Sequence, residues 1–122
     1  MKLFLLTFLL VSFSSIASAD ALPALSCFGT EPFWNLTTSH EGTLTFGNPG
    51  SLESKTLTHT ALVNASGTAG GFAFQIEAKS TDHYRITLNV IKGECNDGMS
   101  DRVYPYNTLV QAEGMVLYGC CK

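Results

Sequence analysis

The chain has 122 residues, with ten acidic and seven basic side chains, and its formal net charge at pH 7 is −3. This length fits one domain of common size. A mildly acidic chain without a basic cluster is a poor partner for nucleic acid, because phosphates attract lysine and arginine. Hydrophobic residues make up 45% of the sequence and charged residues only 14%, so we expect a packed core rather than a disordered chain.

The N-terminal segment has the pattern of a secretory signal peptide. Lys2 precedes an apolar run over residues 3–11, and Ala17-Ser18-Ala19 closes the segment. A positive start, an apolar centre and an A-x-A site are the three parts of such a signal. The apolar run is far shorter than the roughly 20 residues that span a bilayer, so we expect no transmembrane anchor. We predict cleavage after Ala19 and a single mature domain, residues 20–122, that is periplasmic or secreted.

Lipid attachment at Cys27 is an alternative start of the mature protein. In Ala24-Leu25-Ser26-Cys27 the leucine stands one position away from its place in a good lipoprotein signal. The polar segment 12–18 also separates the apolar run from this cysteine. We therefore favour cleavage after Ala19 over lipid attachment.

The predicted mature chain alternates between apolar and polar residues with a period of two and shows no sustained 3.6-residue spacing, which is typical of β-strands. In residues 83–92 this alternation places Tyr84, Ile86, Leu88 and Val90 on one face. Turn residues such as Gly47-Asn48-Pro49-Gly50 separate the runs. We predict strands at Phe33–Thr38, Thr43–Phe46, Leu52–Asn64, Phe72–Lys79, His83–Lys92, Thr108–Ala112 and Met115–Cys121. About seven or eight short strands at this spacing predict an all-β fold, a small antiparallel barrel or sandwich.

Four cysteines, Cys27, Cys95, Cys120 and Cys121, lie in the predicted mature domain. An even number fits two disulfides formed in an oxidising compartment. A bond between the neighbours Cys120 and Cys121 would close a small strained ring, so we expect Cys27 and Cys95 each to take one of them, in either order. Because adjacent residues of a strand face opposite sides, one bond should point toward the core and the other toward the rim.

The histidines and cysteines do not have the spacing of a metal site. His40, His59 and His83 are scattered, and the sequence has no C-x-x-C pair of the kind that binds zinc. The oxygen-bearing residues after Cys95 do not match a calcium-loop spacing either. We expect neither a metal nor a cofactor.

Two stretches, residues 29–34 and 95–106, gather the residue types of a binding site. Polar groups that converge beside aromatic rings are typical of ligand sites. Asp97-Gly98 and Ser100 are equally typical of a turn that satisfies its own backbone, and the Arg102 side chain could pair with Glu31, Asp97 or Asp101. Both interpretations stay open for the candidate binding residues, which are Glu31, Trp34, Asp97, Ser100, Asp101, Arg102, Tyr104 and Tyr106.

The same residues do not predict an enzyme. Ser100 lacks the G-x-S-x-G context of a nucleophile elbow. Carboxylate pairs such as Asp97 and Asp101 are common in turns and do not by themselves indicate acid–base catalysis. We predict a protein without catalytic residues.

The motifs resemble a family of small exported bacterial envelope proteins. The resemblance rests on Gly29-x-Glu31-Pro32-Phe33-Trp34, on Cys95-x-Asp97-Gly98-Met99-Ser100-Asp101-x-x-Tyr104-Pro105 and on Leu117-x-Gly119-Cys120, and it spans nearly the whole predicted mature chain. That family is largely uncharacterised, and its domain occurs alone or in envelope lipoproteins. The resemblance implies an envelope-located β-domain with a Cys95–Cys120 disulfide and with Cys27 and Cys121 as an additional pair. It implies no catalytic residues.

These observations lead to two functional hypotheses. The first is an exported monomeric module that binds an unidentified small ligand or envelope protein at the region of Trp34 and residues 97–106. The second is an inhibitor of a basic enzyme such as lysozyme, since an acidic disulfide-bonded domain suits a basic target. An exposed loop at residues 100–102 favours the inhibitor, whereas side chains turned inward around a cavity favour a small ligand.

Overall fold

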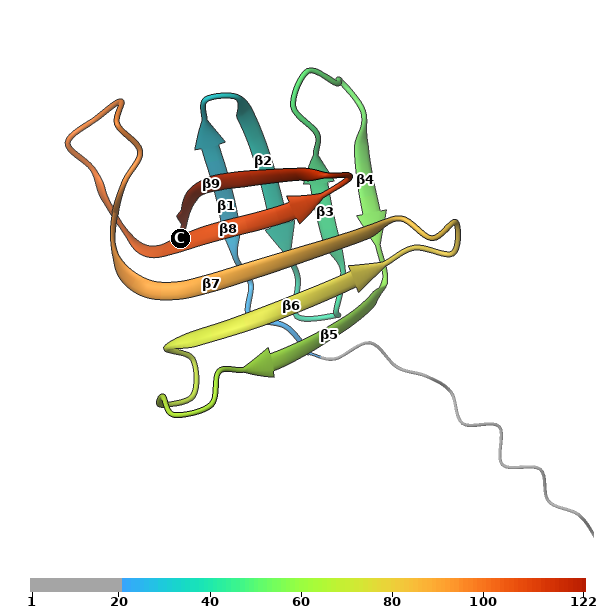
Figure 1. The fold of residues 1–122 in the computed structure, drawn as a ribbon, viewed down its shortest axis with the longest axis horizontal. Coiled ribbons are helices and arrows are strands. Elements are labelled where there is room, and N and C mark those ends of the chain that lie inside the picture. Colours follow the sequence, from blue (N-terminus) through green and yellow to red (C-terminus); the bar gives the residue numbers. More distant parts are fainter. Residues whose placement is uncertain (1–20) are drawn as a thin grey trace, which may run out of the picture.

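The computed structural model describes residues 21–122, which form nine β-strands in one antiparallel sheet. The predicted signal segment, residues 1–19, lies outside the described residues. Figure 1 shows β1–β4 crossing behind β5–β9, so the sheet folds over on itself and confirms the predicted all-β class. The strands are β1 (Ser26–Thr30), β2 (Phe33–Thr38), β3 (Leu44–Gly47), β4 (Ser54–Leu57), β5 (His59–Asn64), β6 (Ala73–Lys79), β7 (Arg85–Asn96), β8 (Val103–Ala112) and β9 (Met115–Cys121).

The sheet forms a nearly closed barrel because its two edge strands are neighbours in the chain and its first and last strands in sequence pair. The strand order is β4-β3-β2-β1-β9-β8-β7-β6-β5, so β4 and β5 lie at opposite ends of the sheet. These two strands follow one another in the chain with only Thr58 between them. The first and last strands, β1 and β9, pair through Cys27 with Cys121 and Phe28 with Cys120. The expected small antiparallel barrel or sandwich is confirmed as a nearly closed barrel, in which β4 and β5 remain the edge strands.

A corner at Thr58 explains part of the difference between nine strands and the predicted seven or eight. The sequence predicts one alternating strand over Leu52–Asn64. In the structure Leu57 is buried, the next two residues are exposed, and Thr60 is buried again. This shift of the alternation by one residue lets the chain leave its pairing with β3 and begin its pairing with β6.

Strand β1 has no counterpart among the predicted strands. Its five residues, SCFGT, are too few for a clear alternation and include the flexible Gly29. Its place in the sheet is determined by its neighbours, since it pairs along its whole length with β2 and through Cys27 and Phe28 with β9.

The core lies between the two layers of the folded sheet. The predicted inward face of residues 83–92 is confirmed, because Tyr84, Ile86, Leu88 and Val90 are all buried. These side chains pack in one cluster with residues of β2, β3 and β4, among them Leu36, Phe46 and Leu57. Burial of apolar surface at about 25 cal/mol per Å² is the main stabilising term for a cluster of this kind.

The residues that precede β1 also belong to the core. Leu22 and Leu25 are buried in the central cluster. The Thr38 hydroxyl accepts from the Leu25 amide at 2.9 Å and donates to the Pro23 carbonyl. Leu22 and Leu25 therefore belong to the folded domain.

Trp34 occupies the junction of β1, β2 and β9. Its side chain is only 4% exposed, and its indole Nε1 donates to the Tyr118 carbonyl at 3.3 Å. The ring lies against two glycines of neighbouring strands: a Cβ atom at Gly29 would meet Trp34 Cδ1 at 2.7 Å, and one at Gly119 would meet Trp34 Cζ2 at 2.7 Å. Phe33 on the opposite face is 70% exposed. One ring of this pair is therefore a core residue and the other a surface residue.

The two disulfides join Cys27 to Cys121 and Cys95 to Cys120. Cys27 and Cys121 belong to the core cluster, whereas the second bond is buried outside that cluster. One bond therefore lies in the core cluster, as expected, and the other lies outside that cluster but is also buried. The pairing also selects between the two connectivities that the sequence leaves open. The Cys27 sulfur is occupied by this bond and is not free to carry a lipid.

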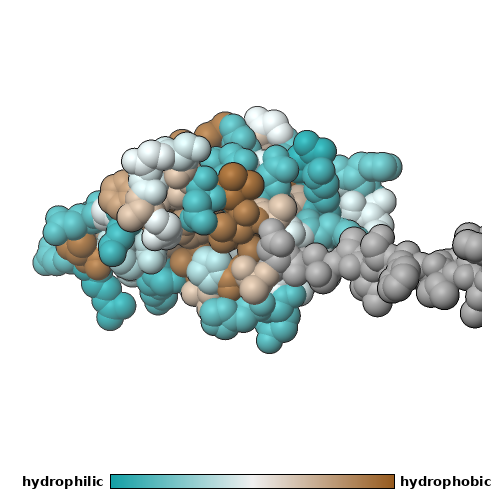
Figure 2. All heavy atoms as spheres, turned by 90° about the horizontal axis from the view of Figure 1, so that it is seen from below, coloured by the Kyte–Doolittle hydropathy of each residue, from teal (hydrophilic) through white to brown (hydrophobic). Residues whose placement is uncertain are grey.

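The surface of the barrel is mixed in character. Figure 2 shows hydrophobic atoms reaching the surface near the middle of one side, surrounded by hydrophilic atoms. Large apolar side chains that are exposed include Phe33, Leu52, Met99, Leu109 and Tyr118. The described part of the chain contains no helix long and apolar enough to cross a membrane.

The packing of Trp34 predicts that a methyl group at Gly119 destabilises the fold. A Cβ atom there would overlap the Phe28 carbonyl as well as the indole. We expect Gly119→Ala to lower the free energy of unfolding by about 1–3 kcal/mol or more, as overpacked sites do, measured by urea denaturation. Gly70→Ala is the matched control, because a Cβ atom at Gly70 has no neighbour within 4 Å. Equal stability of the two variants would contradict this account of the junction.

Candidate functional site

The predicted motif stretch forms the end of the β7–β8 hairpin. β7 continues to Asn96 and β8 begins at Val103, so both strands extend further into the motif than the sequence predicts. Between them, residues 97–102 form a loop that projects beyond the sheet (Figure 1). The register shifts between Lys92 and Cys95, where two residues of β7 face Pro105 alone. A bulge of this kind bends and twists a hairpin, and the Asn107 amide bridges it by donating to the Gly93 and Glu94 carbonyls at 3.4 and 3.2 Å.

The loop satisfies its own backbone. Asp97 Oδ1 accepts from the backbone amides of Met99 at 2.9 Å and Ser100 at 3.1 Å. Asn96 Oδ1 accepts from the Gly98 amide at 2.7 Å, and Gly98 has a positive φ of 76°. Side-chain oxygens that cap nearby amides in this way make a loop rigid without regular structure. The interpretation of residues 96–100 as a self-contained turn is therefore supported by its geometry.

Three contacts fasten this loop to the β1–β9 junction. The Thr30 hydroxyl donates to the Asp97 carbonyl at 3.2 Å. The Phe28 and Tyr104 rings meet edge to face with their centroids 4.8 Å apart. The Cys95–Cys120 disulfide ties the base of the loop to β9. The two sequence motifs thus meet in space, although they are more than sixty residues apart in the chain.

The structure separates the candidate binding residues into three groups. Trp34 is buried beneath the sheet, and Asp97, Tyr104 and Tyr106 are half-buried. Tyr106 packs against the core cluster. The remaining candidates are exposed, and they are Glu31, Ser100, Asp101 and Arg102.

Arg102 does not form the pair considered for it. Its side chain is exposed, and the hydrogen bonds of this residue are made by its backbone: the amide donates to Ser100 Oγ and the carbonyl accepts from Asn96 Nδ2. Asn96 and Asp97 hold the loop instead, because their short side chains accept hydrogen bonds from nearby loop amides.

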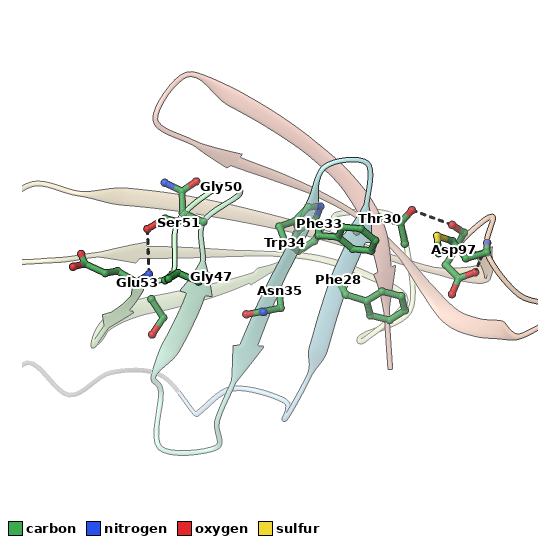
Figure 3. Close-up of a pocket in the computed structure, with 15 residues that line it drawn as sticks. Phe28, Thr30, Phe33, Trp34, Asn35, Gly47, Gly50, Ser51, Glu53 and Asp97 are labelled. Carbon is green, nitrogen blue, oxygen red and sulfur yellow. Dashed lines mark hydrogen bonds between the residues drawn. The ribbon is translucent and has the colours of Figure 1, made fainter.

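A groove of about 870 Å³ runs along the outer side of the β1–β2 hairpin. Figure 3 shows Ser51 and Glu53 toward one end, Thr30 and Asp97 toward the other, and Phe33 between them. Of the predicted candidates, Trp34 and Asp97 line this groove, and the other six do not. The groove joins three separate segments: the β1–β2 hairpin, the loop between β3 and β4, and the β7–β8 loop.

The β3–β4 loop supplies groove residues that the sequence predicts as a turn, at Gly47–Gly50, and as the beginning of a strand, at Leu52 and Glu53. In the structure that strand begins only at Ser54. Ser51 donates its amide to the Asn48 carbonyl at 3.2 Å, and Gly50 between them has a φ of 74°, so the predicted turn at Gly47–Gly50 is confirmed. This turn places Leu52 and Glu53 at the groove. No local signal marks these residues as part of a site, because their partners in the groove come from distant strands.

The groove is acidic and partly apolar. Its charged lining residues are Glu53 and Asp97, both carboxylates, and no lysine, arginine or histidine of the described chain lines it. Phe33, Leu52 and Met99 line it and are strongly exposed. Exposed apolar side chains beside like-signed charges are typical of a surface that binds another molecule.

A second, smaller groove of about 430 Å³ lies between β4 and the turns that follow β6 and β8. Lys55 Nζ stands over the Tyr84 ring at 4.0 Å from its centroid. The Tyr84 hydroxyl is buried without a hydrogen-bond partner; burial, and then the charge of Glu113, raises the pKa of Tyr84 above its usual value. A hydrogen bond from Ser80 lowers the pKa of Asp82. This groove mixes both signs of charge, and none of its lining residues belongs to the two motifs.

Comparison with protein-family models, with curated proteins and with solved structures finds no match for this chain. The resemblance to exported envelope proteins therefore stays a prediction. Within residues 21–122, no cluster of three or more histidine, cysteine, aspartate or glutamate side chains could hold a metal ion.

The Cys95–Cys120 bond predicts a measurable contribution to stability at the site. It closes a separation of 25 residues, for which the loss of chain entropy in the unfolded state amounts to about 3.5 kcal/mol. We expect the double variant Cys95→Ser/Cys120→Ser to lose roughly this free energy of unfolding in denaturant titrations. Dithiothreitol should then lower the free energy of unfolding less in the variant than in the parent, because the parent has two disulfides to reduce and the variant has one. A parent and variant of equal stability would show that the bond does not constrain the chain.

Proposed function

We propose that this chain is an exported, non-enzymatic binding module whose partner is a protein. The observation that carries the proposal is the β7–β8 loop, which is exposed at Ser100, Asp101 and Arg102 yet held by its own hydrogen bonds. A small ligand is usually enclosed over most of its surface. Here the side chains point outward and the adjacent groove is open, which supports a protein partner instead.

The chemistry of this face also suits a protein interface. Phe33 is 70% and Met99 66% exposed, and Leu52 is fully exposed. Apolar and aromatic anchors of this kind supply most of the binding energy in protein complexes, while a polar rim contributes specificity. Glu31, Glu53 and Asp101 are exposed and could form such a rim. We call the groove together with the loop 97–102 the acidic face.

The contacts of Ser100 support a structural rather than a catalytic role. Its hydroxyl donates to Asp97 Oδ1 at 3.4 Å and accepts from the Arg102 amide at 3.3 Å. Asp97 Oδ1 is in turn shared with two loop amides. Because these contacts all lie within the loop, this pair suits the fixing of a loop better than the activation of a nucleophile.

Export is supported by the two disulfides and by the signal-peptide pattern. Disulfides of this structural kind persist in the periplasm or outside the cell and are rare in a reducing cytosol. The described domain begins with residues 21–25 packed on the barrel, which agrees with cleavage after Ala19.

Photo-crosslinking tests the proposed face. We expect p-benzoylphenylalanine at Phe33 or Met99 to trap a protein partner in the cells that make this chain, with a defined crosslinked peptide in the mass spectrum. Val63 on β5 is the matched control, because it is exposed to a similar degree on a different part of the barrel. The proposal is wrong if neither position on the acidic face yields an adduct, or if position 63 yields the same adduct equally well.

Inhibition of a basic enzyme such as lysozyme is a second candidate function, favoured by the rigid exposed loop. A preorganised loop loses little entropy when it enters a cleft, which strengthens binding. We expect the mature domain to slow lysozyme in a cell-wall lysis assay, and Asp101→Asn to weaken this inhibition while Glu94→Gln, an exposed control of equal charge change, does not. Undiminished lysis at high domain concentration would exclude this candidate for the enzyme tested.

A further inference from the structure

One end of the acidic face has the chemistry of an arginine-binding site. Asn35, Asn48 and Glu53 line the groove at the β3–β4 loop. The strands bring them together, because Asn35 pairs with Gly47 and Gly47 pairs with Ser54. Gly47 has no side chain, and the Asn35 amide lies over it: a Cβ atom on Gly47 would be 2.5 Å from Asn35 Oδ1. Two amide groups and a carboxylate are therefore gathered on one side of the hairpin.

One acceptor at this end lacks a donor within the described residues: Asn48 Oδ1 is buried and has no hydrogen-bond partner. A buried acceptor without a donor costs free energy. A ligand with N–H groups can recover that free energy if the Asn48 amide turns toward the groove. The Glu53 backbone amide is bound to Ser51 Oγ at 3.1 Å, which holds the loop while the carboxylate remains exposed. No basic side chain of the described residues lines the groove to neutralise that charge.

We propose that this end of the groove receives an arginine side chain from a protruding segment of the partner protein. The guanidinium has five N–H donors in a planar fork, which suits one carboxylate and two amide oxygens better than an ammonium group does. Phe33 lies two residues before Asn35 on the same outward face of β2 and offers an exposed aromatic ring for the arginine or its neighbours. Apolar residues of the same segment would cover Leu52 and Met99.

This inference rests on the proposed function, because it states which chemistry of a protein partner the acidic face recognises. It goes beyond that function by assigning a site to residues 35, 48 and 53, none of which belongs to either sequence motif. The Asp97 end of the groove is separate: Asp97 Oδ1 is occupied by loop amides, so the arginine is assigned to the Glu53 end.

A titration with a single amino-acid derivative tests the site without knowledge of the partner. The probe is N-acetyl-arginine amide, added to the ¹⁵N-labelled mature domain at millimolar concentration, and the matched neutral probe is N-acetyl-citrulline amide. We expect the arginine probe to shift the backbone amide signals of Gly47, Ser51 and Glu53 in a saturable way, and the citrulline probe to leave them unchanged. Because the ion pair between the arginine probe and Glu53 would lie near the surface, about 0.5 M salt should weaken binding of the probe.

Two variants make the result specific. Glu53→Gln keeps the size of the side chain and removes its charge, and we expect it to weaken arginine binding about two- to fivefold, the range for one exposed ion pair. Glu94→Gln makes the same charge change at an exposed position outside the groove and should bind as the parent does. Equal shifts with citrulline, equal weakening by the two variants, or shifts that spread over the whole barrel would each overturn the proposal.

The outcomes of this titration and of the crosslinking experiment are independent. A partner trapped at Phe33 or Met99 together with an arginine probe that does not bind would refute the arginine site and leave the proposed function standing. An arginine probe that binds at Glu53 while no partner is trapped would refute the protein-binding function as stated and leave a site for free guanidinium compounds.

Discussion

The pairing of the first strand with the last, packed against one tryptophan, is the constraint on which the rest of this structure depends. β1 and β9 pair through Cys27 with Cys121 and through Phe28 with Cys120, and Ser26 exchanges two further backbone hydrogen bonds with Lys122. This short pairing is the seam that joins the two halves of the sheet. The seam is reinforced by the Trp34 side chain, which passes over Gly29 of β1 and reaches Gly119 of β9, and by the Cys27–Cys121 bond in the core. Two glycines are needed because any larger side chain would keep the ring from the backbone.

Closure of this seam determines which segments can form a site. Once β1 lies beside β9, its Thr30 reaches the β7–β8 loop, and the Cys95–Cys120 bond joins that loop to the same edge. The β3–β4 loop arrives from the other side through the β1–β2–β3 hairpins. The groove is thus a consequence of barrel closure, and its three walls come from parts of the chain that share no local pattern.

Several motif residues hold this architecture together. Gly29, Trp34, Gly119 and Cys120 build the seam, and Asn96 and Asp97 fold the loop back on itself. What this framework leaves exposed is a set of side chains outside the motifs or at their margins, such as Phe33, Leu52 and Glu53. A rigid loop and a preformed groove lose little conformational entropy on binding, which is an advantage for a small domain with few contacts to offer.

The amino-acid sequence by itself determined the class of the fold, the number of disulfides and the local turns. Alternation with a period of two and glycine at the turns are patterns of a few residues, and the number of cysteines is a property of the composition. All three can be recognised without knowledge of the fold. The sequence also placed Phe33 and Trp34 on opposite faces, because adjacent strand residues must point apart. It did not reveal β1, whose pattern is too short, or the corner at Thr58, where the alternation shifts.

Only the tertiary structure decided which cysteines pair, where Arg102 points and which residues line the groove. Arg102 and the aspartates of one motif, with Glu31 of the other, suggested ion pairs. In the structure the short side chains of Asn96 and Asp97 hold the loop amides, and the Arg102 side chain is exposed. Asn35, Asn48 and Glu53 meet only because three strands pair in one register. Register and closure are set by burial and packing over the whole barrel, and no short stretch of sequence contains that information.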